Sequence, residues 1–466
     1  MIKFGTGGWR AIIGDEFTKA NVQKLAQALS MEEHDNGVVI GFDRRFLSDV
    51  AAMWLAEVLA GNNIKVHFIE KAVPTPITMF GVKELNTNYG VAITASHNPA
   101  LYNGVKVFTK GGKDADERTT DQLEINLRKL GTIKSIPFEE GLKSGIISYY
   151  KPNNNYIDSI IDSMDVKAIR DANLRVLVDP MHGVSKTSLS TILNSARVDV
   201  EIINDRHDTL FGGKLPSPAS ATLGKLQEMV KSESFHMGIA TDGDADRIGI
   251  VDEFGNFIHP NLLLCLLYYY LLEYKQWTGA VVRNLSTTHM LDKIAKDHGE
   301  EAIETPVGFK HITEGMEKYN ALIGGESSGG LTIRGHISGK DGIFAATLLV
   351  EMIAVTKKTI HQLVKEIYEK YGSYYNQERD YRFSDENKEL VHTLLMEQKQ
   401  VPIFDQEIDR VSYIDGVKVY FKDDSWVCAR FSGTEPLIRI FSESSTRQSS
   451  IDSITAFESF LGIESI

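Results

Sequence analysis

The chain has 466 residues, of which 42% are hydrophobic and 24% are charged, and its 63 acidic and 50 basic side chains give a net charge of -13. This length requires about three or four folding units, and the composition excludes a disordered or fibrous protein in favour of a soluble globular enzyme. The excess of acidic side chains argues against a nucleic-acid partner.

The predicted elements form a regular alternation. Short apolar runs that end in glycine or aspartate alternate with helical periodicity along most of the chain, which predicts parallel α/β sheets. The runs are at 38–43, 91–93, 176–179, 238–240 and 281–283. Polar, turn-rich stretches at 151–155, 253–256 and 371–379 indicate domain boundaries.

The last part of the chain has a different pattern. Residues 411–414, an Asp415-Gly416 turn and residues 417–421 predict a β-hairpin, and two more strand-like runs follow. We therefore predict three mixed α/β domains, over 1–150, 151–254 and 255–372, and a smaller, mostly antiparallel α+β domain over 373–466.

The sequence also bears on where the protein works. Its first residues lack the apolar core of a signal peptide, and the longest apolar run, 262–272, is too short to span a bilayer as a helix. The two cysteines, Cys265 and Cys428, lie in apolar stretches, which indicate core positions rather than a disulfide. We therefore expect a cytoplasmic protein with no membrane partner.

A candidate nucleophile follows one of the predicted strands. Ser96 lies just after the apolar run 89–94, so its hydroxyl is expected on a loop at the carboxyl edge of an α/β sheet, where such folds place their chemistry. Pro99 prevents an immediate helix and helps to define the loop. The alternative is that Ser96 is an ordinary turn residue.

A candidate metal site lies 146 residues further on. Asp242, Asp244 and Asp246 alternate with small residues, and this spacing aims three carboxylates at one hard cation such as Mg²⁺. An EF-hand calcium loop fits less well, because Arg247 occupies the position of its glycine and the flanks predict strands rather than helices. A solvated acidic turn is the remaining alternative. Together with Ser96, the cluster indicates phosphoryl transfer through a seryl intermediate.

Two further segments suit a phosphorylated sugar. The segment 430–439 combines Arg430, Arg439 and a hydroxyl-rich glycine turn, Ser432-Gly433-Thr434, which together can bind a phosphate dianion. The glycine-rich segment 324–330 places Glu326 and Ser328 on a strand-end loop, where they can bond sugar hydroxyls, although a plain flexible loop is an equal alternative. Arg10 and Lys106 lie near predicted turns, and each, taken alone, is expected to be a solvated surface charge.

These motifs occur in the order seen in the α-D-phosphohexomutases, and the chain resembles this family over essentially its whole length. The resemblance implies four domains around a central cleft and a phosphorylated Ser96. It further implies Mg²⁺ on Ser96 and the three aspartates, sugar hydroxyls on Glu326 and Ser328, and the phosphate that is not transferred on the 430–439 loop. The other site residues that it indicates are Arg10, His97 and Lys106 as catalytic groups and Arg247, Gly308 and Lys310 as substrate contacts.

Details of the resemblance bear on the substrate. The Gly308-Phe309-Lys310 form is more like glucose-type enzymes than phosphoglucosamine mutases, which tend to have Asp-Arg there. Ser327 occupies a position where glutamate is frequent in the family. Gly330 occupies the position where the dual-specificity mannose/glucose group usually has histidine, and because this histidine is missing, Lys106 and Arg10 become the candidates for proton handling.

We therefore expect a phosphoglucomutase that uses hexose 1,6-bisphosphate as intermediate and activator and is a monomer or dimer. A phosphomannomutase, a hexose bisphosphate synthase and a non-catalytic sugar-phosphate-binding protein are the alternatives.

Overall fold

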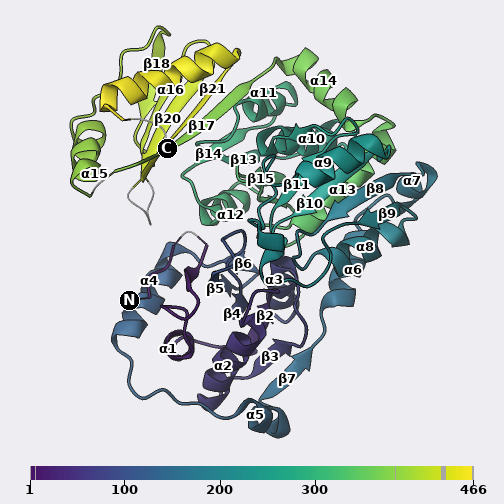
Figure 1. The fold of residues 1–466 in the computed structure, drawn as a ribbon, viewed down its shortest axis with the longest axis vertical. Coiled ribbons are helices and arrows are strands. Elements are labelled where there is room, and N and C mark those ends of the chain that lie inside the picture. The colour runs from purple at the N-terminus through teal and green to yellow at the C-terminus, as the bar shows by residue number, and fades with distance from the viewer. Residues whose placement is uncertain (1, 6, 384, 432–436, 464–466) are drawn as a thin grey trace.

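The computed structural model describes residues 2–5, 7–383, 385–431 and 437–463. These residues form four sheets that follow one another in chain order along an arc, with the C-terminal sheet beside the third (Figure 1). Cys265 and Cys428 are both buried and unbonded. No helix in this part of the chain is long and apolar enough to cross a membrane.

The first sheet has seven strands in the order β1-β5-β4-β2-β3-β7, with β6 paired to β5. Its strands are β1 (Trp9–Ile12), β2 (Val38–Phe42), β3 (Val66–Ile69), β4 (Tyr89–Ile93), β5 (Tyr102–Thr109), β6 (Lys113–Asp114) and β7 (Ile147–Tyr150). The four strands β4, β2, β3 and β7 are parallel, whereas β5 and β1 are antiparallel to their neighbours. All five residues of β2 are buried, as expected for a strand covered on both faces.

The second sheet has the order β12-β11-β10-β8-β9. Its strands are β8 (Arg175–Asp179), β9 (Asp199–Ile202), β10 (Met237–Thr241), β11 (Ile248–Val251) and β12 (Phe257–Ile258). The antiparallel pair β10 and β11 encloses the acidic turn at 242–247, which confirms the strands predicted on both sides of it. The predicted division after residue 254 falls in the turn that joins β11 to β12.

The third sheet has the order β14-β13-β15-β16. Its strands are β13 (Val281–Asn284), β14 (Ala302–Thr305), β15 (Ile323–Gly325) and β16 (Leu331–Ile333). The prediction of three mixed α/β domains is confirmed, and the parallel strands expected from the apolar runs are joined in each of the first three sheets by antiparallel strands at one edge. Short connections join β4 to β5, β10 to β11 and β15 to β16, and a short connection permits only an antiparallel return.

Helices cover the faces of these sheets. The buried helices α10 (Pro260–Glu273) and α13 (Gly342–Thr356) pack beside the second and third sheets and join them. The remaining helices are α1 (Lys19–Leu29), α2 (Ser48–Gly61), α3 (Thr75–Glu84), α4 (Glu117–Arg128), α5 (Phe138–Ser144), α6 (Asn153–Ile161), α7 (Val166–Asp171), α8 (Lys186–Ser195), α9 (Gly224–Ser232), α11 (Met290–Asp297), α12 (Phe309–Lys318), α14 (Ile360–Tyr371), α15 (Asp385–His392) and α16 (Arg447–Leu461).

The fourth sheet has the order β17-β21-β20-β19-β18, and all of its pairings are antiparallel. Its strands are β17 (Tyr375–Arg382), β18 (Ile408–Ser412), β19 (Val417–Phe421), β20 (Trp426–Phe431) and β21 (Leu437–Ser444). Helix α16 packs on β17 and β21. The predicted hairpin around Asp415-Gly416 and the α+β character of this domain are thereby confirmed.

Candidate active site

Ser96 lies on a tightly held loop after β4. Its backbone has a φ of 52°, in the left-handed region that is costly for a residue with a side chain. Its N–H donates to Thr94 Oγ1 at 2.8 Å, and its carbonyl accepts from Arg45 Nη2 at 2.5 Å. The surrounding structure therefore imposes the conformation that presents the Ser96 hydroxyl.

Arg45 is the main anchor of this loop. Its buried guanidinium also donates to the carbonyls of Asn98 at 2.7 Å and of Pro99 and Tyr102 at 3.0 Å. Asp43, which directly follows β2, pairs with Arg45 at 3.3 Å and accepts from Thr94 Oγ1 at 2.6 Å. The sequence prediction missed both residues, although Asp43 ends a predicted strand that lies next to β4.

The cluster of three aspartates contacts Ser96 through Asp242. Ser96 Oγ donates to Asp242 Oδ2 at 2.7 Å, and candidate ligand atoms of Asp242, Asp244 and Asp246 lie within 4.8 Å of one another. All four side chains are buried. A Cβ atom at Gly243 would lie 2.7 Å from the Ser96 carbonyl oxygen, so a glycine there lets the two loops approach this closely.

Two lysines neutralise part of this charge. Lys106 Nζ donates to Asp244 Oδ2 at 2.6 Å and to Asp246 Oδ2 at 2.7 Å, and Lys340 Nζ lies 3.2 Å from Asp246 Oδ2. Burial alone would lower the pKa of Lys106, but the two carboxylates raise it above its ordinary value. Lys106 is thus a buried residue of strand β5 rather than a solvated charge at a turn. The sequence prediction did not identify Lys340.

The cluster also has the oxygen atoms that a divalent cation needs. Asp244 Oδ1 and Asp246 Oδ1 are buried and make no hydrogen bond to any residue that the structure describes. Burial, followed by the charges of Asp244 and Asp246, raises the pKa of the Asp242 carboxyl well above its usual value. Carboxylate oxygens are ligands that Mg²⁺ prefers, so the donor set fits this ion.

Three further predicted residues border Ser96. His97 Nδ1 lies 3.3 Å from Ser96 Oγ, and the charge of Arg247, followed by burial, holds the pKa of His97 far below its usual range. Arg10, on β1, donates from Nη1 to Asn98 Oδ1 at 2.6 Å. The imidazole is therefore neutral, and two guanidinium groups supply the positive charge next to the serine loop.

The residues predicted to recognise the sugar lie close to the carboxyl ends of three strands. Glu326, just after β15, accepts from the N–H of Gly308 at 3.1 Å and from Asn284 Nδ2 at 3.2 Å. Gly308 has a φ of 129°, which favours glycine, and it is followed directly by helix α12. Ser328 is exposed, and Lys310 Nζ lies 3.4 Å from Glu117 Oε2 in the first domain.

Gly330 explains how Lys340 reaches the aspartates. A Cβ atom at this position would lie 2.4 Å from Lys340 Cδ, so the lysine side chain occupies the space that a larger residue would take. Gly330 also bridges to Arg247 in an antiparallel contact. The sugar loop and the acidic turn are therefore packed against each other.

The predicted phosphate clamp lies in the fourth domain. Arg430 and Arg439 face each other across β20 and β21. Arg430 Nε donates to Asp415 Oδ2 at 2.8 Å, and Arg439 Nε donates to Asp380 Oδ1 at 2.6 Å. Ser432, Gly433 and Thr434 lie outside the described residues.

Comparisons with known proteins find the same family along nearly the whole chain. Models of phosphoglucomutase/phosphomannomutase α/β/α domains I, II and III match residues 1–133, 154–255 and 259–371, and that of the C-terminal domain matches 383–457. A Thermococcus kodakarensis protein named phosphoglucomutase/phosphomannomutase is 30% identical over 457 residues, which cover 96% of this chain and 95% of that protein. A Pyrococcus furiosus protein assigned as a phosphoglucosamine mutase is 31% identical over 445 residues, with 96% and 94% coverage. A solved Thermus thermophilus structure, assigned as a phosphomannomutase, is 29% identical with a TM-score of 0.85 and covers 99% of each chain.

Proposed function

Because the chain belongs to the α-D-phosphohexomutase family, we propose that it interconverts glucose 1-phosphate and glucose 6-phosphate by way of a phosphorylated Ser96. The observation that carries the proposal is the 2.7 Å hydrogen bond from Ser96 Oγ to Asp242 Oδ2, which sets a hydroxyl against three buried carboxylates. Such a site suits phosphoryl transfer, whose catalysis consists chiefly of positioning and charge stabilisation.

In the proposed reaction, the phosphoryl group moves from Ser96 Oγ to the free hydroxyl of the sugar phosphate. The bond from phosphorus to Ser96 breaks as the bond to the sugar oxygen forms, and the hydroxyl proton passes to a carboxylate of the site. Lys106 and Arg10, the candidates for proton handling from the sequence, are both cations, and the ion pairs of Lys106 with Asp244 and Asp246 keep it protonated. Their proposed role is therefore to stabilise the charge on the phosphoryl group. The hexose 1,6-bisphosphate then turns end for end and returns its other phosphoryl group to Ser96.

Asp242, Asp244 and Asp246, together with the Ser96 oxygen, would hold Mg²⁺. When bound there, the ion neutralises the carboxylates beside the phosphoserine and polarises its phosphorus–oxygen bond. Lys106 and Lys340 keep the remaining carboxylate oxygens oriented, since they contact Asp244 Oδ2 and Asp246 Oδ2.

We assign the binding of the substrate to three groups of residues. Glu326 and Ser328 would bond sugar hydroxyls that are present in both orientations of the sugar. Lys310, Gly308 and Arg247 would line the same region. Arg430, Arg439 and the segment Ser432-Gly433-Thr434 would bind the phosphate that is not transferred. The Gly308-Phe309-Lys310 form of the loop supports glucose as the sugar.

A second candidate function is phosphoglucosamine mutase. It is supported by the Pyrococcus furiosus relative, which is 31% identical and carries that assignment. The two candidates share the chemistry at Ser96 and differ only in the group at the second carbon of the sugar.

A coupled assay of the purified protein tests the proposal. Glucose, mannose and glucosamine 1-phosphates would be supplied in turn, with Mg²⁺ and a trace of glucose 1,6-bisphosphate. We expect the highest kcat/KM for glucose 1-phosphate. A higher value for another sugar would contradict the glucose assignment, accumulation of free bisphosphate would indicate a synthase, and binding without turnover would indicate a non-catalytic protein.

A further inference from the structure

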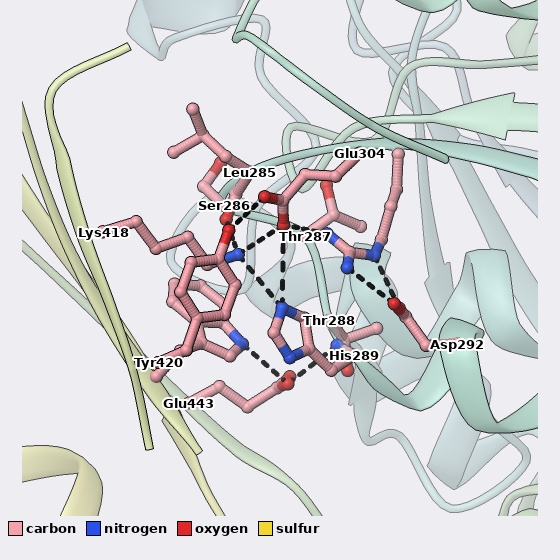
Figure 2. A network of polar contacts seen from close by, with 12 residues as sticks. Leu285, Ser286, Thr287, Thr288, His289, Asp292, Glu304, Lys418, Tyr420 and Glu443 are labelled. Atoms are coloured by element: carbon pink, nitrogen blue, oxygen red, sulfur yellow. Dashed lines mark hydrogen bonds and ion pairs between the residues drawn. The ribbon is translucent and has the colours of Figure 1, made fainter. Parts of the chain in front are cut away.

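The fourth domain meets the third along a buried polar network at the carboxyl ends of β13 and β14 (Figure 2). Lys418 Nζ donates to the carbonyl of Leu285 at 2.6 Å and to Glu304 Oε2 at 2.7 Å, and the Tyr420 hydroxyl also donates to Glu304. Glu443 Oε1 accepts from the N–H of His289 at 2.8 Å. These contacts hold strands β19 and β21 against the third sheet.

Asp415 makes a separate contact at the margin of this interface. It lies in the turn between β18 and β19, and its Oδ2 accepts from the N–H of Val307 at 2.9 Å and from Arg430 Nε at 2.8 Å. Val307 directly precedes Gly308, whose own N–H is bound by Glu326. One carboxylate oxygen therefore joins the loop at 307–308 of the third domain, which Glu326 links to the sugar loop, to an arginine of the fourth.

We propose that Asp415 is a positioning residue for substrate recognition: it fixes the phosphate-binding Arg430 at a set distance and orientation from the loop at 307–308 and from Glu326 of the sugar loop, which binds Gly308. The inference rests on the proposed function, in which Arg430 binds the phosphate that is not transferred. It adds a specificity element, since the spacing between the two groups selects ligands that carry both a sugar ring and a phosphate.

The geometry of Arg430 supports this role. Asp415 accepts a hydrogen bond from the Nε–H of Arg430, and the two terminal amino groups of Arg430 make no hydrogen bond to any described residue. The edge formed by Nη1 and Nη2 is therefore the one available for bidentate bonds to a phosphate. A carboxylate that binds at Nε also prevents rotation of the guanidinium plane, so the edge points in one direction.

Electrostatics and positioning predict opposite effects at this residue. Asp415 carries a negative charge next to the anion site, so its neutralisation should strengthen phosphate binding if charge alone mattered. If Asp415 acts by positioning, the same neutralisation should weaken the binding of sugar phosphates. The sign of the change therefore separates the two explanations.

The test uses the full-length protein and the variants Asp415→Asn and Asp415→Glu. The first removes the charge, and the second keeps the charge but displaces the carboxylate. We expect both to raise KM for the preferred hexose 1-phosphate by about tenfold, with a smaller change in kcat, because a contact used in ground and transition states acts mainly on KM. The matched control is Asp409→Asn, in the same hairpin, whose side chain pairs only with the neighbouring Arg410 among the described residues and should leave KM unchanged.

Binding by isothermal titration gives a second measurement. Asp415→Asn should weaken the affinity for hexose 6-phosphate about tenfold but leave the affinity for inorganic phosphate within about twofold, since inorganic phosphate does not contact the sugar loop. Hexose 6-phosphate bound equally well or more tightly by Asp415→Asn and Asp415→Glu would overturn the inference. Arg430→Ala should weaken the binding of both hexose 6-phosphate and inorganic phosphate. If it does not, the phosphate clamp in the proposed function is refuted instead.

Discussion

At the scale of single residues, the proposed chemistry depends on how Ser96 is presented. Its backbone has a positive φ, and its hydroxyl donates a hydrogen bond to Asp242 Oδ2 of the acidic turn at 2.7 Å. The hydroxyl is buried, so bulk water competes little with a sugar hydroxyl for a phosphoryl group carried there.

Replacement of Ser96 by alanine should abolish mutase turnover, because Ser96 is proposed as the sole carrier of the phosphoryl group. The fold should remain, since the change removes only one oxygen atom from the loop. Intact-mass measurement should detect a phosphate adduct on the wild-type protein that the variant lacks. Turnover by Ser96→Ala close to the wild-type rate would exclude Ser96 as the carrier.

Asp244→Asn should weaken the binding of Mg²⁺ and lower kcat by orders of magnitude. A neutral amide supplies less charge to a divalent cation, while Thr75 Oγ1, at 2.7 Å, can still donate to the amide oxygen. Activity measured against Mg²⁺ concentration checks this prediction. Asp199→Asn, an exposed position on β9, is the control, and an Asp244→Asn titration with wild-type midpoint and plateau would remove Asp244 from the metal site.

At the scale of elements, two loops from different sheets have to approach within hydrogen-bonding distance. The loop after β4 is anchored by Arg45, whose guanidinium satisfies four backbone carbonyls. The turn between β10 and β11 contributes Gly243, the residue that lies against the Ser96 carbonyl. The distance between Ser96 and the carboxylates therefore depends on the absence of a side chain at this glycine.

Gly243→Ala should separate the two loops, because the added Cβ would lie 2.7 Å from a backbone oxygen that cannot rotate away. We expect a loss of about 1–3 kcal/mol in unfolding free energy, as for other overpacked sites, together with a lower kcat. Urea unfolding and steady-state kinetics measure the two effects. Gly224→Ala is the matched control, because a Cβ there meets no atom within 4 Å, and equal behaviour of the two variants would contradict the prediction.

At the scale of the whole molecule, the contact between the third and fourth domains contains a buried lysine. Lys418 lies between Glu304 and the rings of Trp426 and Tyr420. Burial, followed by the charge of Arg283, lowers the pKa of Lys418 to about 8 from an ordinary value of 10.5. The charged form is therefore less favourable in the folded protein than in the unfolded chain.

This shift predicts an unusual pH dependence for the interface. Between about pH 8 and 10.5 the unfolded chain binds a proton at Lys418 that the folded protein has released, so stability due to this group rises with pH. The unfolding free energy of wild type minus that of Lys418→Met should rise across this window by up to about 1.4 kcal/mol per pH unit.

Urea unfolding followed by tryptophan fluorescence measures this difference from pH 7 to 10. Lys422→Met is the control, since Lys422 is an exposed residue that follows the same strand and pairs with Glu407. This variant shows how the loss of an exposed lysine from the same part of the domain affects the measurement. A wild-type minus Lys418→Met difference that falls with rising pH would contradict the lowered pKa.

Much of the molecule follows from local sequence patterns. The alternating aspartates, the strand that precedes Ser96, the hairpin at Asp415-Gly416 and the family itself were all predictable, because each depends on spacing within a few residues or on the order of motifs. The edge strands were the exception, since strand direction depends on the connections rather than on apolar runs.

What the sequence by itself determined is the chemistry that is available: a hydroxyl on a strand-end loop, three carboxylates in one turn, a glycine-rich loop and a pair of arginines. Only the tertiary structure decided which groups meet. Lys106 and Lys340 join the aspartates, Arg45 holds the Ser96 loop, and Asp415 connects Arg430 to Val307. The physical reason is that burial and strand order bring together residues that are distant in sequence. A charged side chain that is expected to be solvated from its sequence context alone forms an ion pair when it and its partner are both buried.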